Sequence, residues 1–61
     1  MKLFFYGMRL RPAAPGAQPA GLYDIKEDSA GKYWNIISYK KELTPEEVSN
    51  YDLDFIQEKE A

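Results

Sequence analysis

Residues 1–11 are predominantly apolar and are predicted to form a β-strand, in which successive side chains point to opposite faces. One face of this strand carries Phe4, Tyr6, Met8 and Leu10, and the other carries Leu3, Phe5, Gly7 and Arg9. Both faces are largely apolar, so a single covering helix cannot bury them, and we expect a second molecule on the face that the helix leaves open. Gly7 marks either a bulge or a close approach to the backbone.

The segment 32–40 is the richest in aromatic and β-branched residues, which favour strands. It is entered through residues 28–31, which place Asp28 first and Gly31 fourth, as in a type I turn. Residues 22–27 alternate in the same way. We therefore predict a hairpin over residues 22–41, with 32–40 as the central strand of a sheet.

Between these strands, residues 12–21 contain three prolines and two glycines, which exclude a regular strand or a helix interior. Two interpretations of this loop stay open. It is either a stiff connector folded over one face of the sheet or a recognition loop that presents Gln18, its only polar side chain.

The clearest local signal is the run Thr44-Pro45-Glu46-Glu47, which joins an N-cap residue, a proline at the first helical position and a glutamate three residues after the cap. It predicts a helix over residues 44–50. Residues 51–56 alternate strictly and favour a fourth strand, although Tyr51 and Phe55 also fit a continued helix. We expect residues 57–61 to be a frayed acidic tail.

These elements predict one small α+β domain: an antiparallel sheet of three strands, or four, with one short capped helix. A chain of 61 residues without cysteine forms a marginal core, so we expect a homodimer. Four aromatic residues are the candidates for the dimer interface: Phe5, Tyr33, Trp34 and Tyr39.

Catalytic chemistry is not expected. The sequence has no histidine and no cysteine, which removes the usual nucleophile–base pairs and nearly all zinc sites. We predict no catalytic residue, no cofactor and no metal. Without a targeting segment or a membrane-spanning apolar run, the expected location is the cytoplasm.

The net charge of −2 is unevenly distributed, because residues 1–21 carry three basic and no acidic side chains while residues 44–61 carry six acidic ones and one lysine. The candidate partner-binding residues are Arg9, Arg11, Gln18 and Tyr6. The alternative is that Asp52, Asp54 and the acidic tail neutralise the arginines. Arginine beside tyrosine also suits nucleic-acid binding, but an acidic chain with so few basic residues makes nucleic acid an unlikely partner.

Several short motifs together carry a family resemblance. They are Tyr6-Gly7-Met8-Arg9-Leu10-Arg11, Pro15-Gly16-Ala17-Gln18-Pro19, Gly31-Lys32-Tyr33-Trp34 with Ile36, and Leu43-Thr44-Pro45-Glu46-Glu47 through Tyr51 and Leu53. The chain resembles very short proteins of phages and mobile elements of Gram-positive bacteria, among them phage inhibitors of the Hachiman antiviral defence system, whose host complex contains a helicase-like subunit. The resemblance implies a non-enzymatic, homodimeric inhibitor that acts by binding a host protein complex in the cytoplasm. The competing functions are a small nucleic-acid-binding regulator and a structural accessory subunit of a larger complex.

Overall fold

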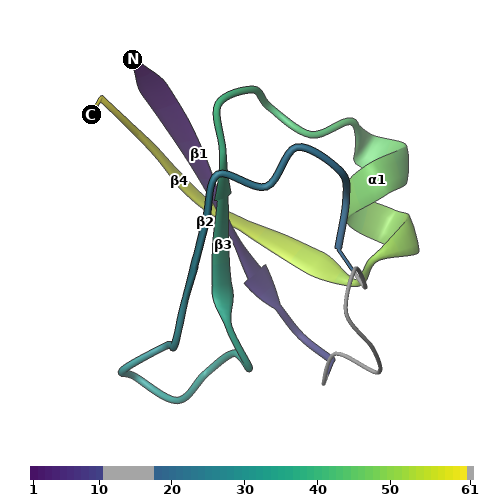
Figure 1. Cartoon of the computed structure of the whole chain (residues 1–61). Helices are drawn as coiled ribbons and strands as arrows, with labels where there is room; N and C mark the ends of the chain where they lie inside the picture. Colours follow the sequence, from purple (N-terminus) through teal and green to yellow (C-terminus); the bar gives the residue numbers. More distant parts are fainter. Residues whose placement is uncertain (11–17, 61) are drawn as a thin grey trace.

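Four antiparallel strands and one helix make up the fold, in a computed structural model that describes residues 1–10 and 18–60. The elements in chain order are β1 (Lys2–Met8), β2 (Asp24–Lys26), β3 (Ile36–Tyr39), α1 (Pro45–Asn50) and β4 (Leu53–Glu60) (Figure 1). The strands form one sheet in the order β2-β3-β1-β4. The predicted α+β fold with a small antiparallel sheet and one short helix is confirmed, and the fourth strand is present.

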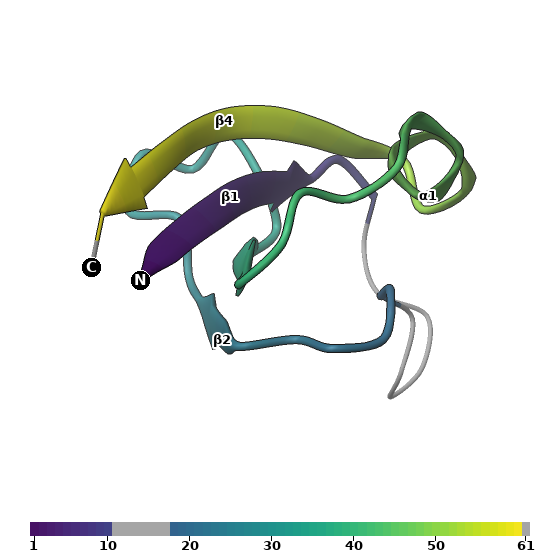
Figure 2. The same ribbon diagram turned by 90° about the horizontal axis from the view of Figure 1, so that it is seen from above.

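β1 is an inner strand that pairs with β3 on one side and β4 on the other. One face of the sheet holds the core, which consists of Tyr6, Met8, Ile37, Tyr39, Leu43 and Leu53. α1 lies at one end of the sheet, next to the start of β4 (Figure 2). The even-numbered residues of β1 share one face, as predicted, and the structure shows that this face is the core face.

The helix α1 begins at Pro45 and ends at Asn50, which confirms the prediction from its cap. The Glu47 N–H donates to the Thr44 hydroxyl at 3.1 Å, and the Thr44 N–H donates to the Glu47 carboxylate at 3.0 Å. This reciprocal capping box satisfies two amides that a helix start would otherwise leave unpaired. Among the described residues, no helix is long and apolar enough to cross a membrane.

The strand predicted over residues 32–40 is shorter in the structure, because β3 covers only Ile36–Tyr39. The N–H groups of Lys32 and Tyr33 donate to the Asp28 carboxylate at 2.9 Å each, so they are not available to a neighbouring strand. Pairing with β1 resumes at Trp34, whose N–H donates to the Met8 carbonyl at 3.0 Å.

The first two predicted strands are also longer than the observed ones. β1 ends at Met8, and β2 spans only Asp24–Lys26. Most of the predicted loop, residues 12–17, lies outside the described residues, as does Arg11. The last part of the predicted loop is held at Pro19, which is buried. The Pro19 carbonyl accepts a hydrogen bond from the Tyr39 hydroxyl at 2.7 Å.

β4 is longer than predicted, and the expected frayed tail is wrong as far as Glu60. The reason is that residues 57–60 pair with β1 from Phe5 back to Lys2. A β-bulge precedes them: Phe5 pairs with Gln57 and Tyr6 pairs with Phe55, so Ile56 is an extra residue on β4. The extra residue of a bulge interrupts the alternation of side chains between the two faces of a strand. The residues after it continue to pair with β1, where the Lys2 ammonium lies 3.2 Å from the Glu58 carboxylate.

The second face of the sheet, opposite the core, is covered in part by the Tyr33 ring. A Cβ atom added to Gly7 would lie 2.5 Å from carbons of that ring, so Tyr33 rests directly on the glycine. The Tyr33 hydroxyl donates to the Asp54 carboxylate of β4 at 3.0 Å. Gly7 therefore marks a close approach to the backbone, one of the two meanings expected from its position in the strand.

We expect Gly7→Ala to destabilise the fold by about 1–3 kcal/mol, the usual cost of overpacking, because the added methyl displaces the Tyr33 ring. Denaturant unfolding measures the change. In a Tyr33→Ala background the same substitution has room, and a strand alanine restricts the unfolded chain more than glycine does, so its effect should be neutral or stabilising. An equal loss in both backgrounds would contradict the Tyr33–Gly7 contact.

Candidate protein-binding surfaces

The loop that precedes β3 is organised by the carboxylate of Asp28. This carboxylate accepts hydrogen bonds from the N–H groups of Ala30 at 3.1 Å, Lys32 at 2.9 Å and Tyr33 at 2.9 Å. The Gly31 N–H donates to the Asp28 carbonyl at 3.0 Å, and Gly31 has a φ of +75°, a conformation that glycine adopts readily. The predicted turn is therefore present, and its first residue also fixes the two residues that follow the turn.

The same hydrogen bonds stabilise the ionised form of Asp28. The hydrogen bond from the Tyr33 N–H is the largest effect and holds the pKa of the Asp28 carboxyl below its ordinary value of 3.8. Desolvation, the second largest effect, opposes it, and the amides of Ala30 and Lys32 and the charge of Lys32 lower the pKa further. The loop conformation is thus linked to the charge of one carboxylate.

Three backbone segments that carry exposed apolar and aromatic side chains meet where β1 ends. We call this region the end patch and define it as Arg9, Leu10, Trp34 and Tyr51. Leu10 is 59% exposed, Trp34 is 55% exposed and Tyr51 is 39% exposed. Backbone hydrogen bonds join these segments: the Trp34 N–H donates to the Met8 carbonyl of β1 at 3.0 Å, and the Arg9 N–H donates to the Asp52 carbonyl at 3.1 Å. A hollow of about 290 Å³ lies beside Arg9 and Trp34.

Arg9 has carboxylate partners at this patch. Its Nε lies 3.3 Å from an oxygen of Asp54, and its Nη2 lies 3.8 Å from an oxygen of Asp52. The guanidinium is half exposed, so these pairs contribute at most about 1 kcal/mol to stability. They match the alternative in which the arginine is neutralised by Asp52 and Asp54.

Two of the predicted contact residues have to be withdrawn because they are buried. Tyr6 is 1% exposed, and its hydroxyl accepts a hydrogen bond from the Leu43 N–H at 2.9 Å. Tyr39, expected at the dimer interface, is 0% exposed, and burial raises the pKa of its hydroxyl to about 12. Gln18 is half-buried, and Arg11 lies outside the described residues.

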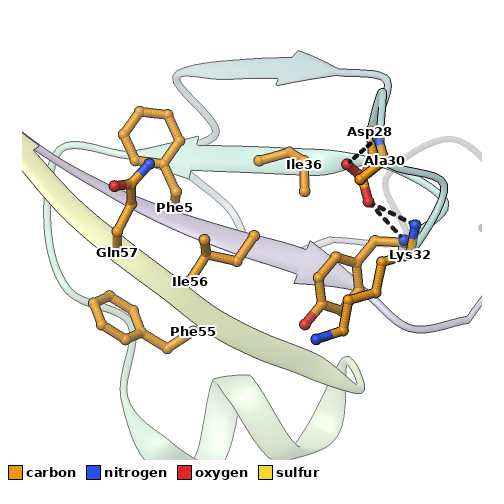
Figure 3. A pocket seen from close by; sticks show the side chains of 9 residues that line it. Phe5, Asp28, Ala30, Lys32, Ile36, Phe55, Ile56 and Gln57 are labelled. Carbon is orange, nitrogen blue, oxygen red and sulfur yellow. Dashed lines mark hydrogen bonds between the residues drawn. The ribbon is translucent and has the colours of Figure 1, made fainter.

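A second surface lies on the sheet face opposite the core. It is an open groove of about 500 Å³, which we call the second-face groove. Phe5 of β1, Ile36 of β3 and Ile56 of β4 line it with apolar atoms, and the Gln57 amide lies near Phe5 (Figure 3). Phe5 and Tyr33, both predicted at a dimer interface, line this groove, whereas Trp34 belongs to the end patch.

Sequence reasoning missed Leu10, Tyr51 and Ile56 as surface candidates. Alternation assigns Leu10 to the core face of β1, but the strand ends before it and the side chain is exposed. Ile56 and Gln57 both line the groove although they are consecutive, because the bulge interrupts the alternation between them. In the sequence, an isoleucine followed by a glutamine is only a weak indication of a bulge. No other sequence feature predicts that Ile56 and Gln57 face the groove.

In the part of the chain that the structure describes, residues 1–10 and 18–60, no group of three or more metal-ligating side chains lies together. The described surfaces present aromatic, apolar and paired charged groups to a partner.

A comparison with known families adds the biological setting. A family model described as "Defence against restriction A C-terminal" matches residues 1–58. The chain belongs to this family. The expectation of an anti-defence family is confirmed at this level, and the family's description refers to defence against restriction. No curated protein and no solved structure matches the chain.

In this member of the Defence against restriction A C-terminal family, acid should loosen the loop that carries Trp34. Because the pKa of Asp28 is lowered in the folded chain, its stabilising effect is complete above pH 3.8 and is lost as the pH falls through the lower, folded-state pKa. Trp34 is the only tryptophan, so its fluorescence reports on the loop. We expect an acid transition in its emission that Asp28→Asn removes.

The matched control is Glu27→Gln, which changes the neighbouring carboxylate and leaves the three hydrogen bonds to Asp28 in place. It should titrate like the unchanged chain. If Asp28→Asn showed the same transition as the unchanged chain, Asp28 would not be the group that holds the loop.

Proposed function

We propose that this chain counteracts restriction by binding a protein subunit of the restricting enzyme, without catalysis, through the end patch. Membership in a family described by defence against restriction supports the biological role. The observation that carries the binding mode is the exposure of Trp34, Leu10 and Tyr51 next to Arg9. Tryptophan, tyrosine and arginine are the residue types most enriched at binding hot spots.

The support for a protein target comes from the charges around Arg9. Proteins that bind DNA derive affinity from lysine and arginine side chains that neutralise phosphates. The Arg9 guanidinium faces the carboxylates of Asp54 and Asp52, at 3.3 Å and 3.8 Å, and both would repel a phosphate. The net charge of the chain is −2. These charges favour a protein partner over nucleic acid.

The arrangement of the patch also favours tight binding. The backbone of Trp34 is held to Met8 at 3.0 Å and that of Arg9 to Asp52 at 3.1 Å, and Asp28 fixes the turn just before Trp34. Residues whose backbone is already held in place lose less freedom when a partner binds. A preformed aromatic surface of this kind suits stoichiometric inhibition, in which one chain blocks one target.

The identity of the target is the finer part of the proposal. The family description supports a restriction enzyme, while the resemblance to phage inhibitors of Hachiman supports the helicase-like subunit of that defence complex. We give precedence to the restriction enzyme because the family model covers residues 1–58. In either case the proposed site of action is the host cytoplasm, where these defences meet incoming DNA.

The decisive experiment measures the plating of unmodified phage on cells that carry a restriction system. Expression of the chain should restore plating, and the double variant Leu10→Ala, Trp34→Ala should lose at least about tenfold of this protection, which is the effect of about 1.4 kcal/mol in binding. Affinity capture from the same cells should recover the endonuclease or one of its partner subunits with the unchanged chain only. A parallel capture from cells with a Hachiman system tests the second target.

The matched control is Tyr23→Ala, Ile25→Ala, which also removes one aromatic and one aliphatic side chain, 47% and 44% exposed, from the opposite edge of the sheet. It should protect fully. Equal protection by both folded double variants would contradict the end patch as the binding surface. Capture of DNA alone, with a steep loss of binding as salt increases, would support the nucleic-acid alternative instead.

A further inference from the structure

We propose that two copies of the chain associate face to face through the second-face groove, related by a two-fold axis that lies parallel to the sheet and runs across its strands. This inference concerns a different surface from the end patch and does not depend on the proposed function.

The groove is an apolar surface that one chain leaves uncovered. Its floor is formed by Phe5 and Ile36 from the two inner strands, and Ile56, 39% exposed, reaches it from β4 because of the bulge (Figure 3). A sheet normally buries each apolar face against a second layer. Among residues 1–10 and 18–60, α1 and the core occupy the other face and no second layer covers the groove. We assign that layer to another molecule.

Addition of a strand to either edge of the sheet is an unfavourable way to dimerise. β2 has only three residues, of which Asp24 and Lys26 are charged. β4 is longer, but it is interrupted by the bulge and ends in Glu58, Lys59 and Glu60. Short strands, bulges and charged side chains, lysine above all, are the features that prevent edge-to-edge pairing. Of the surfaces that the sheet itself offers, its open face is therefore the favourable route to a dimer.

The shape of this face is self-complementary, because it has one raised row and one open row of side chains. Pairing across the strands defines two rows of side chains, which are Asp24–Ser38–Phe5–Gln57 and Lys26–Ile36–Gly7–Asp54. The Tyr33 ring stands on the second row, where it covers Gly7 and reaches Asp54, while the first row is open at Phe5. An axis between the rows places the raised row of each copy on the open row of the other. Tyr33 then meets Phe5 of the second copy.

The charged side chains on this face are also complementary across the same two-fold axis. Asp24 and Lys26 lie on one face of β2, one in each row, and both line a shallow hollow next to the groove. Within one chain they form only a long, exposed pair at 3.8 Å. The axis that exchanges the rows brings Asp24 of each copy opposite Lys26 of the other, twice by symmetry. A partner of a different sequence would have to supply this complementarity separately, which is why we assign the groove to a second copy.

The size of the face is sufficient. The Cα trace measures 30 × 26 × 18 Å, so the broad side of the molecule is comparable with the roughly 800 Å² per partner that a standard interface buries. The short third dimension corresponds to a sheet with a layer on only one of its sides. A face-to-face dimer gives that sheet its second layer.

The first test is the mass in solution. Light scattering of the 61-residue chain at micromolar concentration should give twice the 7.0 kDa of one chain. Ile56→Lys places a charge in the groove and should raise the dissociation constant at least about tenfold. Ile25→Lys is the control, because Ile25 is similarly exposed at 44% but pairs with the core residue Ile37, so its side chain projects from the other face. A monomer in the unchanged chain, or equal dimers in both variants, would overturn the proposal.

The second test uses the two charges and keeps the proposal falsifiable if Ile56→Lys fails to fold. Lys26→Glu puts like charges opposite each other across the axis, and so does Asp24→Lys, so each variant alone should be mainly monomeric. When the two variants are mixed, each acid again faces a base, and a mixed dimer should form. Two variants that dimerise as well as the unchanged chain, or a mixture that stays monomeric, would contradict the axis. The end-patch variant should keep the dimer mass, which separates this test from that of the proposed function.

Discussion

The contact between the Tyr33 ring and Gly7 is the constraint on which both candidate surfaces depend. A side chain at residue 7 would occupy the space of the ring, since its Cβ would lie 2.5 Å from the ring carbons. With glycine there, the loop before β3 lies flat across β1, and the Tyr33 hydroxyl reaches Asp54 on β4. The loop thereby closes one end of the second-face groove and places the next residue, Trp34, at the end of β1.

This arrangement explains how so small a chain keeps two apolar faces on one strand. β1 buries Tyr6 and Met8 against the core, while its opposite face is divided between Tyr33 and an open groove at Phe5. Two buried tyrosine hydroxyls fix the segments that cover the core face, because Tyr6 accepts from the Leu43 N–H and Tyr39 donates to the Pro19 carbonyl. The fold therefore uses its aromatic residues as anchors for loops as well as for packing.

The two proposed interactions, target binding and dimerisation, use different parts of the molecule. The end patch gathers Trp34, Leu10 and Arg9 beyond the last residues of β1, and the groove lies over the middle of the sheet. A dimer formed through the grooves presents two copies of the end patch. Two linked patches bind a target with repeated subunits more tightly than one patch does, because the second contact forms at a high effective concentration.

Local signals in the sequence were sufficient where neighbouring residues determine the structure. The capping box at Thr44 defines α1, and the turn from Asp28 to Gly31 is present. The prediction failed where residues far apart in the chain interact. The pairing of β4 with β1 continues past the bulge at Ile56, and this pairing makes the expected tail a strand.

The candidate site was predictable only in part, for the same reason. Arg9 was recognised from its charge, and its neutralisation by Asp52 and Asp54 was one of the two readings. Tyr6 was predicted to bind a partner, but it is buried in the core. Alternation alone does not say which face of a strand with two apolar faces is solvent-exposed. The sequence identifies residue types that bind, while the sheet order decides which of them reach the surface.

The most direct test of the central contact is the proton NMR spectrum of the chain. Protons that lie over the face of an aromatic ring are shifted upfield, so the Hα resonances of Gly7 should be strongly upfield in the unchanged chain and return toward ordinary strand values in Tyr33→Leu. Gly31, which has no heavy atom within 4 Å of the position that its Cβ would take, provides the internal reference. Ordinary Gly7 shifts in the folded, unchanged chain would show that the ring does not lie on the glycine, and would contradict the account of both surfaces.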